Sequence, residues 1–139
     1  MWDSQAQGYR LKKRFTGSRY TNLDFHRTEV FLTKILEELY GKGNIVTSYH
    51  PLWAISSKNV LLEYDILVVD QTLLIEYNGE QHYKRSKFFH KTQKQFSDQK
   101  KRDKYKIKAA RLNGYKLVTF KYDEPLFKDY IISRIKEVE

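Results

Sequence analysis

The apolar residues of this chain recur with two different spacings, and their succession predicts the order of helices and strands. Residues 24–40 have a helical spacing, and their apolar stripe consists of Phe25, Leu32, Leu36 and Leu39, with Ile35 beside it. Gly41 ends this helix. Residues 45–49 have the composition of a strand. Residues 52–55 are expected to extend that strand or to form a second short one, because Pro51 disrupts the pairing between the two segments.

Two longer apolar runs, over residues 62–69 and 73–82, predict strands joined by a tight turn at Asp70-Gln71-Thr72. A two-residue loop at Asp70-Gln71 would place Asp65 directly opposite Glu76 on one face of the hairpin. A three-residue loop would instead put the two acids on opposite faces.

The second half of the chain predicts a long helix, a strand and a closing helix. The helix covers residues 91–113 and ends at Gly114, and its stripe consists of Phe96, Asp103, Ile107 and Ala110. Alternation over residues 115–122 predicts the strand. Asp123-Glu124-Pro125 is expected to begin the last helix, whose buried stripe consists of Phe127, Ile131, Ile135 and Val138. We therefore expect a small α/β protein in which helices flank a mixed sheet, in the order α-β-β-β-α-β-α.

Asp65 and Glu76 each interrupt a strand that is otherwise apolar. An unpaired buried carboxylate is costly, so an acid in such a place is typically paired or bound to a cation. Two of them face to face suggest a divalent-cation site, and an all-oxygen site favours Mg²⁺, with Mn²⁺ as the alternative. Glu29 lies on the apolar stripe of the first helix, where it is either a third carboxylate aimed at this site or a residue at the stripe's edge reaching solvent.

Other polar residues flank the acid pair. His82 is a candidate general acid or base or a phosphate contact, and the alternative is a structural hydrogen bond that closes the hairpin. Gln99, Asp103 and Lys106 share one face of the basic helix. We expect Asp103 to form an ordinary ion pair with Lys106 or Arg102, and Lys106 to support Asp103 or the edge of the site.

The net charge of +9 is concentrated in one segment. Residues 84–108 contain eleven Lys and Arg residues and only two acids, so this segment alone accounts for the net charge. A basic segment beside an acidic site favours DNA as the partner. Seven cations are expected to hold the phosphate backbone: Lys84, Arg85, Lys87, Lys91, Lys101, Arg102 and Lys104. The alternative is a solvated charged helix.

Length and composition bound the remaining possibilities. The 139 residues suit a single domain over 1–139, and a hydrophobic content of 40% supports a folded protein. Residues 1–20 are expected to form a flexible basic arm, which either follows a nucleic-acid backbone or is a solvated tail. The sequence shows no membrane span and no secretory leader. The lack of Cys excludes disulfides and thiolate metal sites and fits a cytoplasmic protein.

Two segments resemble the PD-(D/E)XK nuclease superfamily. The run Ile75-Glu76-Tyr77-Asn78-Gly79-Glu80-Gln81-His82-Tyr83 is most similar to the branch of very-short-patch-repair endonucleases and related phage and homing endonucleases. Downstream, Gln99, Asp103 and Lys106, followed by Asn113-Gly114-Tyr115-Lys116-Leu117, resemble that branch's pattern of Gln, Asp and Lys before a Gly and a closing strand. The resemblance covers roughly residues 25–122 and implies a restriction-endonuclease-like core in a bacterial or phage-infected cell.

The resemblance also implies roles for individual residues. Asp65 and Glu76 match the two metal-binding acids, and Glu29 matches the helix-borne acid of part of the superfamily. Asn78 stands where the family's Lys usually stands, and it cannot carry a positive charge. Gln81 and His82 are the nearest replacements.

The expected function is therefore a Mg²⁺-dependent DNA endonuclease that hydrolyses phosphodiester bonds. Two alternatives are a nucleic-acid-binding module of the same fold without activity and a subunit of a DNA recombination or repair complex. A monomer would nick one strand, whereas cleavage of both strands would suggest a symmetric homodimer. The DNA sequence or structure recognised, the choice among homing, repair, restriction and junction-resolving roles, and action on RNA are left open.

Overall fold

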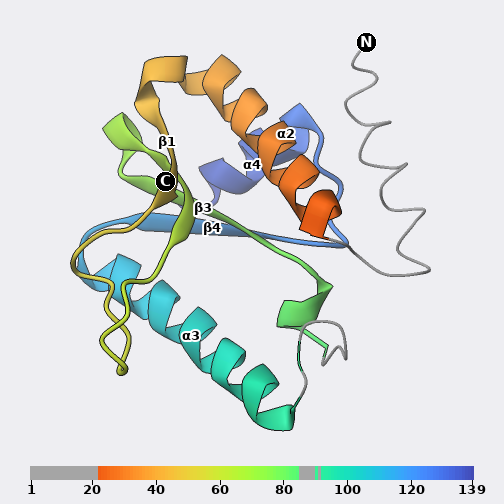
Figure 1. Ribbon diagram of the computed structural model, residues 1–139. Helices are drawn as coiled ribbons and strands as arrows, with labels where there is room; N and C mark the ends of the chain where they lie inside the picture. Colours follow the sequence, from red (N-terminus) through yellow and green to blue (C-terminus); the bar gives the residue numbers. More distant parts are fainter. Residues whose placement is uncertain (1–21, 85–89, 91) are drawn as a thin grey trace.

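The computed structural model describes residues 22–84, 90 and 92–139, so the predicted arm over residues 1–20 lies outside the described residues. The described chain forms a mixed α/β structure whose elements follow the predicted order (Figure 1). They are α2 (Asn22–Tyr40), β1 (Ile45–Tyr49), β2 (Tyr64–Val68), β3 (Leu73–Asn78), α3 (Gln93–Leu112), β4 (Lys116–Lys121) and α4 (Lys128–Lys136). No helix in the described part of the chain is both long and apolar enough to cross a membrane.

The four strands form one sheet in the order β1-β2-β3-β4. β1, β2 and β3 are antiparallel neighbours, and β4 runs parallel to β3 after the crossover through α3. Ile66 pairs with Ile75 and Leu67 with Leu74, so the predicted register, with Asp65 opposite Glu76, is confirmed. The connection is not a two-residue loop. It is a single turn of 3₁₀ helix over Val69–Gln71, followed by a left-handed Thr72 with φ 44°.

Each face of the sheet has its own hydrophobic core. α2 and α4 cover one face, and α3 covers the other (Figure 1). Leu36 of α2, Phe120 of β4 and Ile131 of α4 are fully buried in the first core. The second core is smaller and includes Tyr64, Leu74 and Ala110. Because α3 packs over the face that carries Leu74, its inward side chains meet the next residue of β3 on that face, which is Glu76.

Three predicted details are wrong. Residues 52–55 do not form a strand and contribute only one isolated bridge, between Ile55 and Leu61. The closing helix begins at Lys128 rather than at residue 123, because the Glu124 carboxylate accepts a hydrogen bond from the Lys121 backbone N–H and so fixes a turn after β4. Ile107 is not part of the buried stripe of α3, since it is 42% exposed.

Candidate active site

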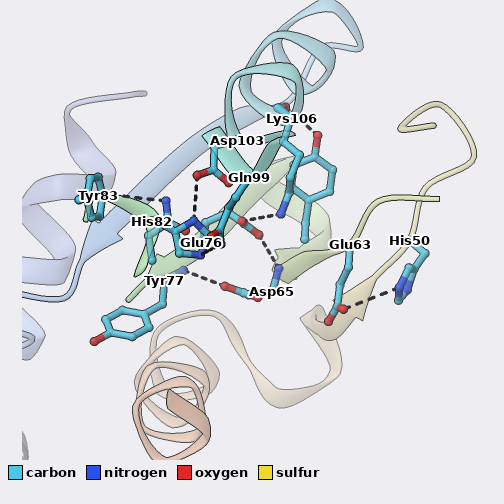
Figure 2. Close-up of polar contacts among 12 residues, drawn as sticks. His50, Glu63, Asp65, Glu76, Tyr77, His82, Tyr83, Gln99, Asp103 and Lys106 are labelled. Carbon is cyan, nitrogen blue, oxygen red and sulfur yellow. Dashed lines mark hydrogen bonds and ion pairs between the residues drawn. The ribbon is translucent and has the colours of Figure 1, made fainter. Parts of the chain in front are cut away.

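The acid pair lies where β2 and β3 stop pairing. The antiparallel ladder ends at Ile66–Ile75, and beyond it each carboxylate bonds to the backbone of the opposite strand (Figure 2). The Asp65 N–H donates to Glu76 Oε2 at 2.8 Å, and the Tyr77 N–H donates to Asp65 Oδ2 at 2.8 Å. The side chains therefore satisfy backbone donors that the ladder leaves unpaired at this point.

Glu76 carries the strongest electrostatic perturbation of the site. Its side chain is 9% exposed, and Lys106 Nζ lies 2.6 Å from its Oε1. Burial, and then the charge of Asp65, raise the pKa of Glu76 to about 8, although Lys106 acts in the opposite direction. Burial also raises the pKa of Asp65, and the hydrogen bond from Tyr77 lowers it in part. The buried Glu76 and the partly buried Asp65 share the charge of one close lysine, so the site favours a further cation.

Lys106 reaches the acid pair from α3, and Tyr64 of β2 fixes its position. The Tyr64 hydroxyl donates to the backbone carbonyl of Lys106 at 2.7 Å, and Lys106 Nζ lies 5.0 Å from the centre of the Tyr64 ring. Lys106 was expected to support either Asp103 or the edge of the site, and the structure agrees with the second. Lys106 binds Glu76, because Glu76 is the carboxylate that lies under this turn of the helix.

Asp103 instead binds His82, which belongs to a chain of polar contacts leading away from the acid pair. Asp103 Oδ2 lies 2.8 Å from His82 Nδ1, and Gln99 Nε2 lies 3.2 Å from His82 Nε2. Gln99 Oε1 lies 2.5 Å from Nε2 of His90, which is buried. With Asp103 as acceptor, Nδ1 of His82 carries the proton, and Nε2 accepts from the Gln99 amide. Both ring nitrogens of His82 are therefore engaged in this conformation, and their partners lie on α3 and not within the hairpin.

These residues surround one cleft of about 310 Å³. Nine of the predicted site residues line it: Glu29, Asp65, Glu76, Asn78, His82, Gln99, Arg102, Asp103 and Lys106. Asn78 is buried, and its amide donates to the Tyr83 hydroxyl at 3.4 Å. The side chain of Gln81 lies outside the described part of the structure.

The other predicted cations are distributed differently. Lys84 and Lys101 are exposed, and Lys84 is paired with Glu80 at 3.4 Å. Lys104 lines a neighbouring groove rather than the cleft. Arg85, Lys87 and Lys91 lie outside the described residues.

Two residues of the site were not found from the sequence. Tyr64 positions Lys106, but in the sequence it is one more aromatic residue in an apolar strand. His90 ends the contact chain from His82, and no motif marks it. Both roles depend on how α3 packs against the sheet, which is a long-range contact.

The cleft contains oxygen ligands suited to Mg²⁺. In the described part of the chain, no three His, Cys, Asp or Glu side chains lie close enough together to hold a metal ion, although Glu29 stands on the cleft wall. Mg²⁺ is commonly bound through one or two carboxylates together with several waters, so Asp65 and Glu76 form a suitable pair. This fit follows from the chemistry of the donors and from the raised pKa of Glu76, because a bound cation would stabilise the ionised form that burial disfavours.

No protein-family model matches the chain, and no solved structure matches it. The chain is similar to uncharacterized protein 307L of Invertebrate iridescent virus 6, with 31% identity over 87 residues. The match covers 63% of this chain and 44% of the viral protein, so the chain spans less than half of that relative's length.

Proposed function

We propose that the protein is a Mg²⁺-dependent DNA endonuclease with a restriction-endonuclease-like core. The observation that carries this proposal is the pair of the partly buried Asp65 and the buried Glu76, which lie on two adjacent strands in one cleft. Among the described residues, Lys106 is the cation that contacts this pair, through Glu76. Such a pair favours divalent-cation binding. Bound Mg²⁺ would neutralise the phosphate, lower the pKa of a bound water and stabilise the departing oxygen.

In this proposal Lys106 takes the place of the lysine that is missing at position 78. Asn78 offers an amide and no charge, whereas Lys106 brings its ammonium group to the same Glu76 from the opposite side of the sheet–helix interface. Its Nζ–H groups can orient a water beside Glu76 Oε1 and offset charge on a phosphate oxygen. Asp103 and Gln99 hold the His82 ring at the cleft wall and engage both of its nitrogens, so His82 shapes the cleft rather than accepting the first proton.

The cations on α3 support DNA as the substrate. Arg102 lines the cleft, and Lys101 and Lys104 lie on neighbouring positions of the helix. Contacts of this kind hold the phosphate backbone without reading sequence.

The second candidate is a DNA-binding module without hydrolytic activity. The hydrogen bonds of Asp65 and Glu76 to backbone N–H groups favour it, because they give both acids a structural role that needs no metal. Asn78, which stands where the nuclease superfamily usually has a lysine, also favours the module without hydrolytic activity.

Cleavage assays separate the two candidates. Supercoiled plasmid, a branched junction and linear duplex are each incubated with Mg²⁺, Mn²⁺ or EDTA. The variants are Asp65→Asn and Glu76→Gln, with Glu38→Gln as a matched control, because Glu38 is exposed on α2 and forms an ion pair with the exposed Lys128, away from the cleft. Metal-dependent cutting that both site variants lose and the control retains would support the nuclease. Binding without cutting on every substrate would overturn it in favour of the binding module.

A further inference from the structure

A second groove adjoins the candidate active cleft. It has a volume of about 700 Å³ and lies between α3, β4 and α4. The cleft and this groove share five lining residues: Glu76, Asn78, His82, Asp103 and Lys106. A chain-like ligand that occupies both would therefore pass directly beside Glu76 and Lys106.

The acids of the groove are already paired, but three of its lysines are not. The Glu124 carboxylate contacts Arg134 and the Tyr130 hydroxyl, and Glu137 lies 3.4 Å from Arg134. Lys100, Lys104 and Lys121 also line the groove, and none of them forms an ion pair with an acid among the described residues. Five basic and four acidic side chains line the groove, and these three lysines remain available to an anionic ligand.

The groove also has apolar and aromatic surface next to these cations. Lys121 Nζ lies 4.7 Å from the centre of the Tyr83 ring. Ile107 is 42% exposed and lines the groove, instead of joining the buried stripe of α3. A small inorganic anion would leave this apolar and aromatic surface uncovered. A nucleotide strand has phosphates that can contact the lysines and flat bases that can contact the apolar side chains.

We propose that this groove binds a short unpaired segment of the DNA strand next to the phosphate in the cleft. Lys100 and Lys104 lie one helical turn apart and face the same way, so they can follow the backbone together with Lys121. Tyr83 and Ile107 contact the bases. A volume of this size accommodates a few nucleotides of one strand and not a duplex. The location of the cleaved phosphate rests on the proposed function, but strand binding in the groove does not require hydrolysis.

The test measures the binding of a fluorescent single-stranded oligonucleotide by anisotropy in EDTA, over a series of salt concentrations. The variant Lys104→Ala/Lys121→Ala is compared with Lys108→Ala/Lys136→Ala, which removes the same charge from exposed residues outside the groove. Each lost phosphate contact should reduce the magnitude of the slope of log K against log salt by about 0.7. The slope of the groove variant should therefore be smaller in magnitude by about 1.4, and that of the control should change much less. Equal slopes for the two variants would overturn the proposal.

A second variant tests the apolar part of the groove. Ile107→Glu places a negative charge there, and the fold tolerates the change because Ile107 is already partly exposed. It should weaken oligonucleotide binding at least about tenfold at low salt, whereas Leu112→Glu, which makes the same charge change at a side chain that is 74% exposed and outside the groove, should cost less. Wild-type affinity for Ile107→Glu would count against the groove.

Plasmid cleavage with the same proteins separates this proposal from the proposed function. If the wild type does not cut but the groove variants lose affinity, the nuclease is wrong and the strand-binding groove stands. If the wild type cuts and the binding slopes are unchanged, the nuclease stands and the groove proposal is wrong.

Discussion

Replacing Glu76 by Gln should remove a pH dependence of stability that the buried acid imposes on the protein. In the metal-free protein, burial and Asp65 raise the pKa of Glu76 to about 8, against 4.5 for an ordinary Glu. The native state therefore holds this proton more tightly than the unfolded chain, and unfolding releases it between these two pH values. The contribution of Glu76 to the free energy of unfolding is therefore fully present below about pH 4.5 and is lost as the pH rises to about 8.

The size of the fall follows from the two pKa values. At about 1.4 kcal/mol for each tenfold change in proton affinity, ionising Glu76 costs the native state on the order of 5 kcal/mol. Gln resembles the protonated acid in size and in having no charge, but Lys106 Nζ and the Asp65 N–H meet different oxygens of Glu76, so one of these donors faces the Gln NH2 group. This lost hydrogen bond costs about the same at every pH, so the stability of Glu76→Gln relative to the wild type should rise by several kcal/mol between pH 4.5 and pH 8.

Urea unfolding in EDTA at a series of pH values measures this difference. Fluorescence of Trp53 reports the transition, because the centre of its ring lies 5.6 Å from the centre of the Tyr64 ring, beside the second core. Other titrating groups, including Asp65, affect both proteins, so the comparison uses the difference between them. A wild-type curve that runs parallel to that of Glu76→Gln from pH 5 to pH 8 would refute the reasoning. If the cleft binds Mg²⁺ as proposed, saturating Mg²⁺ should raise the stability of the wild type near pH 8 and leave Glu76→Gln unchanged.

Three further results are expected. If the protein cleaves DNA as proposed, Lys106→Met should reduce the cleavage rate in single-turnover assays by about 10²–10³-fold, because it removes a positive charge next to the reacting phosphate. Lys108→Met, on the exposed side of α3, should cleave at close to the wild-type rate. Asp103→Asn should change the tautomer of the imidazole that it holds, which ¹⁵N shifts of the ring nitrogens detect, and it should slow cleavage without unfolding the protein. Phe120→Ala should cost about 3–5 kcal/mol in urea unfolding, because Phe120 is fully buried, while Leu52→Ala, at a side chain that is 79% exposed, should cost under about 0.5 kcal/mol.

The order of elements and the strand register could be predicted because they follow from local patterns. The two apolar runs around Asp65 and Glu76 must each keep their hydrophobic side chains on a buried face, and that requirement fixes the pairing even though the turn differs from the one assumed. The conformation of the turn could not be predicted, because Thr72 adopts a left-handed conformation that β-branched residues rarely take.

The partners of the polar residues on α3 could not be predicted, because they depend on the rotation of the helix against the sheet. The helical spacing shows that Asp103 and Lys106 are neighbours on one face, and a pairing between them follows from the spacing alone. In the structure Asp103 contacts His82, and Lys106 contacts Glu76. The exposure of Ile107 has the same origin, since only packing decides which edge of an apolar stripe is covered.

The contacts of the cleft differ widely in sequence separation, and this has a consequence for folding. Asp65 and Glu76 come together within a hairpin, across 11 residues, whereas Lys106 joins Glu76 across 30 residues and only through the crossover of α3. Closing the longer loop costs more conformational entropy, and parallel pairing of β3 with β4 must form with it. We therefore expect the hairpin to form first, with its carboxylates still hydrated, and to lose that water only when α3 brings Lys106 to Glu76. On this expectation the candidate cleft is completed by the docking of α3 and β4 and not by the hairpin that carries its acids.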